Sequence, residues 1–257
     1  MRASVVISAL VAVLVGFGGS VAIVLAAASA VAATPAQTSS WVASICLATA
    51  AISLVLSLRY RAPVVAAWST PGAALIASSS GETMETAVGA FLFAALAILL
   101  TAALRPIGAL IERIPASIAS AMLAGILFSF VLALFDHVTS APELVVPLLL
   151  LFVFVRLFSP IWAVLAVLFC GVALSYALGM TSPLGNLEIS RLVWVSPKFP
   201  IETLMGLGLP LYLVTMASQN LPGFAVLKAN GYEVPTRPVL TVTGLASLAT
   251  AGFCAHT

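Results

Sequence analysis

Long apolar stretches make up most of this chain, and charged residues occur almost only between them. A helix needs about 20 apolar residues to cross the hydrocarbon core of a bilayer. Only 7% of the residues are charged, whereas soluble domains carry about 25%. Backbone polar groups at membrane depth must be hydrogen-bonded within their own segment, which favours helices. The sequence therefore predicts an all-α polytopic membrane protein embedded in a lipid bilayer.

The apolar stretches divide the chain into successive spans. The first is too long for the apolar region of a signal peptide, so we interpret it as an uncleaved span. It is predicted to be interrupted at residues 16–20, and the third span is predicted to break at residues 69–72. We expect spans at about 4–30, 40–58, 63–80, 86–104, 115–135, 143–157, 160–179, 202–227 and 238–250.

The basic residues between the spans predict the orientation. Cytoplasmic loops of membrane proteins are enriched in Lys and Arg. With the N-terminus in the cytoplasm, the inner side receives eight basic residues: Arg2, Arg59, Arg61, Arg105, Arg113, Arg156, Lys228 and Arg237. The outer side receives only Arg191 and Lys198, together with most of the acidic residues (Glu82, Glu85, Asp136, Glu143, Glu188 and Glu202). This bias also supports the number of predicted spans, because one missed helix would place the later basic residues on the opposite side.

Several classes of function have no support in the sequence. The three cysteines, Cys46, Cys170 and Cys254, lie in apolar segments without a CxxC pair or a histidine at metal-ligand spacing. The net charge of +2 is too small to suggest binding to nucleic acid. No span carries a paired aspartate, a Ser-His combination or a nucleotide-binding loop. We therefore expect neither an enzyme nor a site for a metal or a cofactor.

The block from Thr215 to Gly223 places consecutive polar side chains inside an apolar span. Ser218, Gln219 and Asn220 are followed two residues later by a Pro-Gly pair. Proline removes a backbone donor, so carbonyl groups are freed close to the amides. Such a helix either packs its amides against neighbouring helices or turns them toward a substrate, because polar groups at membrane depth need partners.

Interrupted spans favour a transporter over a structural bundle. The third span breaks at Ser69–Gly72, and the chain again becomes polar and glycine-containing after Ala249, where a tenth span should begin. Such breaks at corresponding places in two halves indicate a binding site near the membrane midplane. The N-termini of half-helices there offer free N–H groups to an anion. If a unit of seven spans is repeated, the third span corresponds to the tenth. Because seven is an odd number, the second unit would be inverted in the membrane relative to the first.

Specific residues at these breaks resemble a known family. Thr215–Tyr232, TMASQNLPGFAVLKANGY, closely resembles the benzoate/proton symporter (BenE) family. Residues 66–72, at the break in the third span, and residues 243–256 also resemble it, although the family usually has two glycines where this chain has Cys254 and Ala255. The resemblance covers essentially the whole chain.

The resemblance implies a fold and a division of the chain. The family shares the fourteen-span inverted-repeat fold of nucleobase transporters, with a core and a gate domain. Residues 1–179 would form the first seven-helix repeat, 180–200 an extracytoplasmic loop, and 201–257 the start of the second repeat. The sequence would then be truncated within that second repeat, inside the tenth helix.

The resemblance also implies a site and an activity. Gln219 lies at about the place of a substrate-binding carboxylate in nucleobase carriers, and an amide there avoids repelling an anion. His256 is the candidate for proton coupling, because imidazole titrates near neutral pH. The expected substrate-binding residues are Ser69, Thr70, Pro71, Gly72, Ser218, Gln219 and Asn220.

The predicted function is proton-coupled uptake of benzoate or a related small aromatic carboxylate across the bacterial inner membrane. The partners would be the substrate, protons and the bilayer, and the resemblance also allows a homodimer. Two alternatives stay open at this point. One is a carrier of another anion or a nucleobase. The other is a non-functional or structural membrane fragment, which the end of the chain at Thr257 suggests.

Overall fold

The computed structural model describes residues 3–104, 134–181 and 189–256, together with residues 124, 128, 131 and 132. Most of the predicted span at 115–135 lies outside the described residues. So do four of the charged residues used to predict the orientation, Arg2, Arg105, Arg113 and Glu188.

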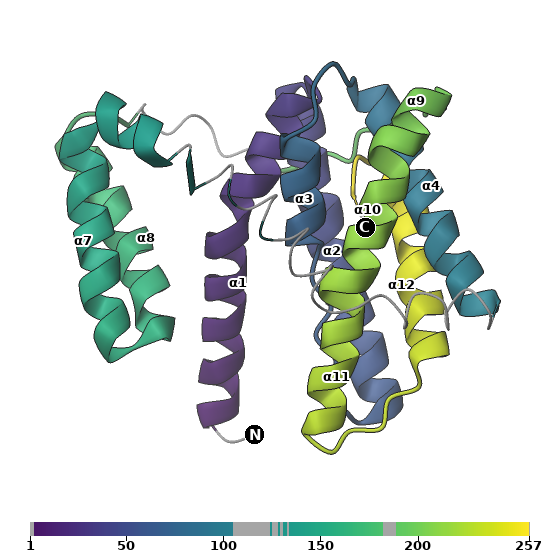
Figure 1. Cartoon of the computed structure of the whole chain (residues 1–257). Helices are drawn as coiled ribbons and strands as arrows, with labels where there is room; N and C mark the ends of the chain where they lie inside the picture. The colour runs from purple at the N-terminus through teal and green to yellow at the C-terminus, as the bar shows by residue number, and fades with distance from the viewer. Residues whose placement is uncertain are drawn as a thin grey trace. The chain divides into compact units, whose positions relative to one another are not determined.

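Helices are the regular structure in the described part of the chain (Figure 1). Their bounds are α1 (Ala3–Ala30), α2 (Pro35–Tyr60), α3 (Thr70–Ala77), α4 (Met84–Ala103), α7 (Pro142–Phe158), α8 (Pro160–Ala177), α9 (Ile201–Thr203), η1 (Leu204–Gly208), α10 (Leu209–Thr215), η2 (Met216–Asn220), α11 (Leu221–Ala229) and α12 (Thr236–Ala251). Four helical stretches are long and apolar enough to cross a bilayer: Ala12–Ala30, Pro35–Tyr60, Met84–Ala103 and Ile201–Lys228. The all-α polytopic prediction is confirmed.

Two interruptions were predicted in the first three spans, and one of them is wrong. α1 continues through residues 16–20 without a break. The Ser20 hydroxyl donates to the Gly16 carbonyl at 2.5 Å, so the serine is satisfied inside the helix. A glycine in a helix costs only about 1 kcal/mol, which the remaining turns of a long helix outweigh. The break in the third span is confirmed, because residues 63–69 are not helical and α3 begins at Thr70.

The described chain forms two compact units. The first contains residues 1–22 and 128–189, and the second contains residues 23–127 and 190–257. In the first unit, α7 and α8 pack against each other and are joined at Ser159. Gly171 of α8 faces Leu148 of α7. The two units are groups of residues that contact one another and do not correspond to sequence repeats. The division of the chain into inverted repeats stays a prediction.

In the second unit, α4 is the central helix. It packs along α12 and α10, and α12 also contacts α2 (Figure 1). The buried face of α4 carries several alanines and Gly89, and such small residues let neighbouring backbones approach closely. Trp41 of α2 and Phe91 are the largest fully buried side chains. The core of this unit therefore lies between α2, α4 and the helices that carry the polar block.

The polar block lies on one continuous helical stretch, α9 to α11, that contains two widened turns. In η1 the Leu209 N–H bonds to the Leu204 carbonyl, and in η2 the Leu221 N–H bonds to the Met216 carbonyl. Each widened turn is followed by a proline, Pro210 or Pro222. A proline ring clashes with the carbonyl four residues earlier, and a wider turn moves that carbonyl away. The α-helical hydrogen bonding expected to be interrupted near Pro222 is thus replaced there by a π-turn.

Candidate functional site

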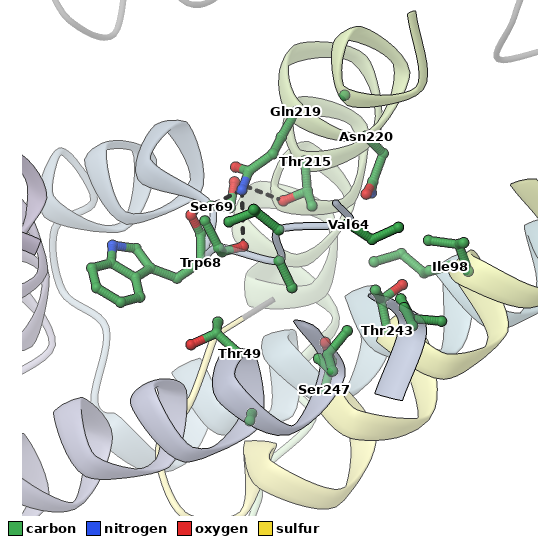
Figure 2. Close-up of a pocket in the computed structure, with 18 of the residues that line it drawn as sticks. Thr49, Val64, Trp68, Ser69, Ile98, Thr215, Gln219, Asn220, Thr243 and Ser247 are labelled. Carbon is green, nitrogen blue, oxygen red and sulfur yellow. Dashed lines mark hydrogen bonds between the residues drawn. The ribbon is translucent and has the colours of Figure 1, made fainter. Parts of the chain in front are cut away.

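A cavity of about 480 Å³ lies inside the second unit (Figure 2). This volume falls in the range of about 300–1,000 Å³ that is usual for small-molecule sites. Its walls come from α2, the extended segment before α3, the helical stretch around η2, α12 and the segment after α12. The polar side chains that line it are Thr49, Ser69, Thr215, Gln219, Asn220, Thr243, Ser247, Thr250 and His256.

Ser69 forms the N-cap of α3 at the edge of this cavity. Its hydroxyl accepts a hydrogen bond from the Gly72 N–H at 3.0 Å, and Thr215 donates to the same oxygen at 3.0 Å. The Ala73 N–H bonds to the Ser69 carbonyl, and Pro71 has no N–H. Within the described part of the chain, only the Thr70 N–H of this first turn keeps no partner. The broken third span therefore offers one backbone donor at the positive end of α3.

Gln219 holds the extended segment that precedes α3. Its side-chain amide donates to the carbonyls of Ala67 and Trp68, at 2.9 and 3.0 Å. Both carbonyls belong to backbone that is not helical. Since both amide hydrogens are engaged, the remaining polar atom of Gln219 is its Oε1 acceptor. Gln219 is thus part of the cavity wall and positions the break in the third span.

His256 joins the two broken segments. Its Nδ1 lies 2.9 Å from the Trp41 indole nitrogen, and its Nε2 lies 3.1 Å from the Ser69 carbonyl oxygen. An indole N–H only donates and a carbonyl only accepts, so Nδ1 is the acceptor and Nε2 carries the hydrogen. The ring is neutral in this arrangement, because an N–H on Nδ1 would oppose the N–H of Trp41. This contact brings the break at Ser69 and the segment after α12 together.

Four residues predicted to bind substrate do not line the cavity. Gly72 is buried against Leu211, where a Cβ would lie 2.7 Å from its Cδ1 atom. Pro71 is buried beside it, and Thr70 is half-buried. The Ser218 hydroxyl is buried without a hydrogen-bond partner among the described residues. Asn220 does line the cavity, and its amide donates to the Met216 sulfur at 3.3 Å.

The hydroxyl groups on α2 and α12 that line the cavity were not among the predicted site residues. Thr243, Ser247 and Thr250 lie on one face of α12, and Thr49 of α2 lies near them in Figure 2. The hydroxyls of Thr243 and Thr250 donate to carbonyls of their own helix, so their oxygens can still accept. Their spacing of four and then three residues is a helical-face signal that was available in the sequence.

The cavity has several polar lining groups but no fixed charge. Among its described lining residues there is no Asp, Glu, Lys or Arg, and His256 is the one titratable side chain. Much of the remaining wall is apolar, including Ile45, Ile52, Val64, Ile98 and Phe224. The arrangement suits a small ligand with an apolar body and a polar end.

Comparison with known proteins gives the family. The family described as "BenE: Benzoate membrane transport protein" matches residues 1–257. This chain belongs to the BenE family. The resemblance found at Thr215–Tyr232 and at the broken spans is therefore confirmed.

Two curated relatives agree with this assignment. The chain is 37% identical over 247 residues to the benzoate membrane transport protein of Acinetobacter baylyi, covering 95% of this chain and 63% of the relative. It is 38% identical over 245 residues to the inner membrane protein YdcO of Escherichia coli, covering 94% of this chain and 62% of the relative. The chain thus spans less than two thirds of the length of either relative. No solved structure matches it significantly.

Proposed function

We propose that this BenE-family chain belongs to a secondary transporter that takes up benzoate, or a similar small aromatic carboxylate, together with protons across the bacterial inner membrane. The observation that carries this proposal is the uncharged cavity at which the two broken segments meet, at Ser69 and His256. The name of the Acinetobacter relative supports benzoate as the substrate. The name of the Escherichia relative supports the inner membrane.

The two kinds of cavity wall match the two ends of an aromatic carboxylate. The aromatic ring would lie against apolar side chains such as Ile52, Val64 and Phe224. The carboxylate would lie at the polar end, where Ser69, the N-cap of α3, lines the cavity and the positive end of that helix favours an anion. Gln219 and Asn220 would orient the substrate from η2, once the amide of Gln219 exchanges one of its backbone carbonyls for the carboxylate.

The absence of a fixed positive charge on the described lining residues supports proton coupling. A carboxylate in a cavity at membrane depth is costly unless its charge is compensated. A proton carried with each carboxylate makes the transported pair neutral. We propose His256 as the proton carrier, since its ring lies between the two broken segments. Protonation of Nδ1 would break the bond to Trp41 and so link the charge of the site to the position of α2.

The decisive experiment is uptake of labelled benzoate into vesicles that contain this chain. We expect accumulation under an imposed inward proton gradient, loss of accumulation with an uncoupler, and no competition by uracil or sulfate. The Acinetobacter relative, tested in parallel, is the positive control. Uptake of labelled uracil, without uptake of labelled benzoate, would favour a nucleobase carrier and contradict the proposal.

Replacement of His256 by glutamine tests the coupling step. Glutamine can donate to the Ser69 carbonyl and accept from the Trp41 indole, but it cannot take up a proton at neutral pH. We expect His256→Gln to retain benzoate exchange between the two sides while losing accumulation driven by the proton gradient. Undiminished proton-driven accumulation by this variant would remove His256 from the coupling step.

The proposed orientation places the N-terminus in the cytoplasm. The contacts inside the second unit are consistent with the predicted sides, because Arg237 lies at the end of α4 opposite to Glu85 and Lys198. A membrane-impermeant thiol reagent tests this orientation with single cysteines introduced at Lys228 and Lys198. We expect labelling from the outside only at position 198, and the reverse pattern would invert the topology.

A further inference from the structure

The extended segment 190–198 contacts three other parts of the second unit and is named the strap here. It contains no regular secondary structure, so its backbone groups must find partners elsewhere. At its start, the Ser190 hydroxyl lies 2.7 Å from the Ser39 hydroxyl of α2. At its end, the Lys198 N–H donates to the Glu85 carbonyl of α4 at 2.9 Å, and the two side chains form an ion pair.

The middle of the strap holds the segment that follows α12. The Val195 N–H donates to the Gly252 carbonyl at 2.8 Å. The Trp194 ring packs edge-on against Phe253, with ring centroids 5.3 Å apart. A Cβ added to Gly252 would overlap the Trp194 ring. The strap and the broken segment are therefore in direct contact at a position where only glycine fits.

Ser40 of α2 connects the strap to the same segment a second time. Its hydroxyl accepts from the Val193 N–H at 2.9 Å and donates to the Phe253 carbonyl at 3.1 Å. Ser44 donates to that carbonyl as well, at 3.3 Å. Residues 252 and 253 are thus bonded from both sides, and the chain then passes through the buried Cys254 and Ala255 to His256.

The strap is also seated on α4 at a glycine. A Cβ at Gly89 would overlap the Lys198 carbonyl, so a larger residue there would lift this end of the strap from the helix. Two glycines far apart in the sequence, Gly89 and Gly252, therefore leave room for the same nine-residue segment. The strap is therefore closely packed against other backbone at its middle, by Gly252, and at its end, by Gly89.

We infer that the strap is a positioning element for the transport site: through Trp194 and Gly252 it fixes residues 252–256 and with them the ring orientation of His256. This inference rests on the function proposed above for His256 and the cavity. The physical reason is that residues 252–256 lie beyond the end of α12, where the N–H groups of residues 253–255 bond back to its last turn. Their carbonyls find partners elsewhere: the Gly252 carbonyl accepts from Val195 of the strap, and the Phe253 carbonyl accepts from Ser40 and Ser44.

The test is labelling of Cys254, which is fully buried beside Gly252, in the chain with Cys46→Ala and Cys170→Ala. We expect Gly252→Ala to raise the rate of N-ethylmaleimide labelling at Cys254 on the order of tenfold, because the new methyl group displaces Trp194. The control is Gly206→Ala, since a Cβ at Gly206 meets nothing within 4 Å. Adding Trp194→Phe to Gly252→Ala makes room for the methyl group and should restore protection of Cys254.

Ser40→Ala is a second variant, which removes a hydroxyl group and adds no volume. Its effect therefore does not depend on how the protein accommodates a steric clash, as that of Gly252→Ala does. We expect it to raise labelling of Cys254 by a few-fold. Protection of Cys254 that is unchanged in both Gly252→Ala and Ser40→Ala would overturn the inference, whether or not the chain transports benzoate. This readout therefore separates failure of the inference from failure of the proposed function.

Transport kinetics test the functional half of the inference. In Gly252→Ala we expect a rise of about tenfold in the apparent KM for benzoate and a shifted pH profile, both reversed by Trp194→Phe. An exposed Cys254 with unchanged KM and pH profile would show that the strap orders the segment without positioning the site, and would overturn that half.

Discussion

At the scale of single residues, the site depends on side chains that satisfy irregular backbone. Gln219 bonds to two carbonyls before α3, and Ser69 and Thr215 complete the first turn of that helix. Irregular backbone at membrane depth needs such partners because lipid supplies none. The polar residues of the site therefore stabilise the break and face the cavity at the same time.

Replacement of Gln219 by leucine should abolish function through this structural role. The carbonyls of Ala67 and Trp68 would lose the hydrogen bonds from Gln219, and a typical hydrogen bond contributes about 0.5–1.5 kcal/mol. We expect uptake of benzoate to fall by about tenfold or more while the chain is still inserted in the membrane. Asn230→Ala is the control, since Asn230 is an exposed amide at the end of α11. Wild-type uptake by Gln219→Leu would remove Gln219 from the site.

Cys254 gives a prediction about backbone strain. Its φ is 73°, in the left-handed region that favours glycine. We expect Cys254→Gly to be more stable than Cys254→Ala by about 1 kcal/mol, although alanine is normally the more stabilising of the two. Thermal unfolding in detergent measures the difference, and the opposite order would show that Cys254 carries no strain.

At the scale of helices, the two widened turns before Pro210 and Pro222 form a matched pair. Each has the same spacing to its proline, but only η2 carries side chains that line the cavity. π-turns inside α-helices are frequent at functional sites. The turn at η2 sets the direction in which Gln219 and Asn220 point.

Substitution of each proline by alanine tests this pair. Alanine restores the N–H and removes the ring clash, so the widened turn can close to an ordinary α-turn. Closing the π-turn shifts the helical register of the neighbouring residues by about one residue. One residue corresponds to a rotation of about 100°, because a turn contains 3.6 residues. We expect Pro222→Ala to reduce benzoate uptake by about tenfold or more and Pro210→Ala to leave it nearly unchanged. Equal effects in the two variants would show that η2 has no special role.

At the scale of the whole molecule, α4 is anchored at both ends by residues distant in sequence. At its C-terminal end, Arg237 donates from Nε to the Ala102 carbonyl at 2.8 Å and from Nη2 to the Ala103 carbonyl at 3.2 Å. At its N-terminal end, Glu82 accepts from Thr86 and from Thr203 at the start of the polar-block helix. These contacts tie α4 to α12 and α9.

Arg237 should therefore contribute to the stability of the second unit. Helix ends leave carbonyl groups without partners, and a cation there also interacts favourably with the helix dipole. We expect Arg237→Ala to lower the free energy of unfolding by about 1–2 kcal/mol. Arg237→Lys should recover only part of that loss, because lysine lacks the forked geometry. Lys228→Ala is the control, and an equal loss there would make the effect one of general charge.

Much of the fold followed from the sequence, because long apolar runs in a bilayer have few alternatives to helices. The bounds of α2, α4, α7, α8 and α12 lie within a few residues of the predicted spans. The broken third span and the polar block at Ser218–Asn220 were also found, since proline and buried amides are visible in any helical pattern. The glycines at 16–20 misled the prediction, because a long helix tolerates them.

Only the tertiary structure decided how the broken segments are used. It placed His256 between Trp41 and Ser69, turned Gln219 toward backbone carbonyls, and left Ser218 and Gly72 away from the cavity. It also laid the strap across Gly252 and Gly89. The sequence determined where helices form because that depends on local hydrophobicity and backbone bonding. Which side chains meet depends on the packing of segments up to about two hundred residues apart, and no local pattern records those contacts.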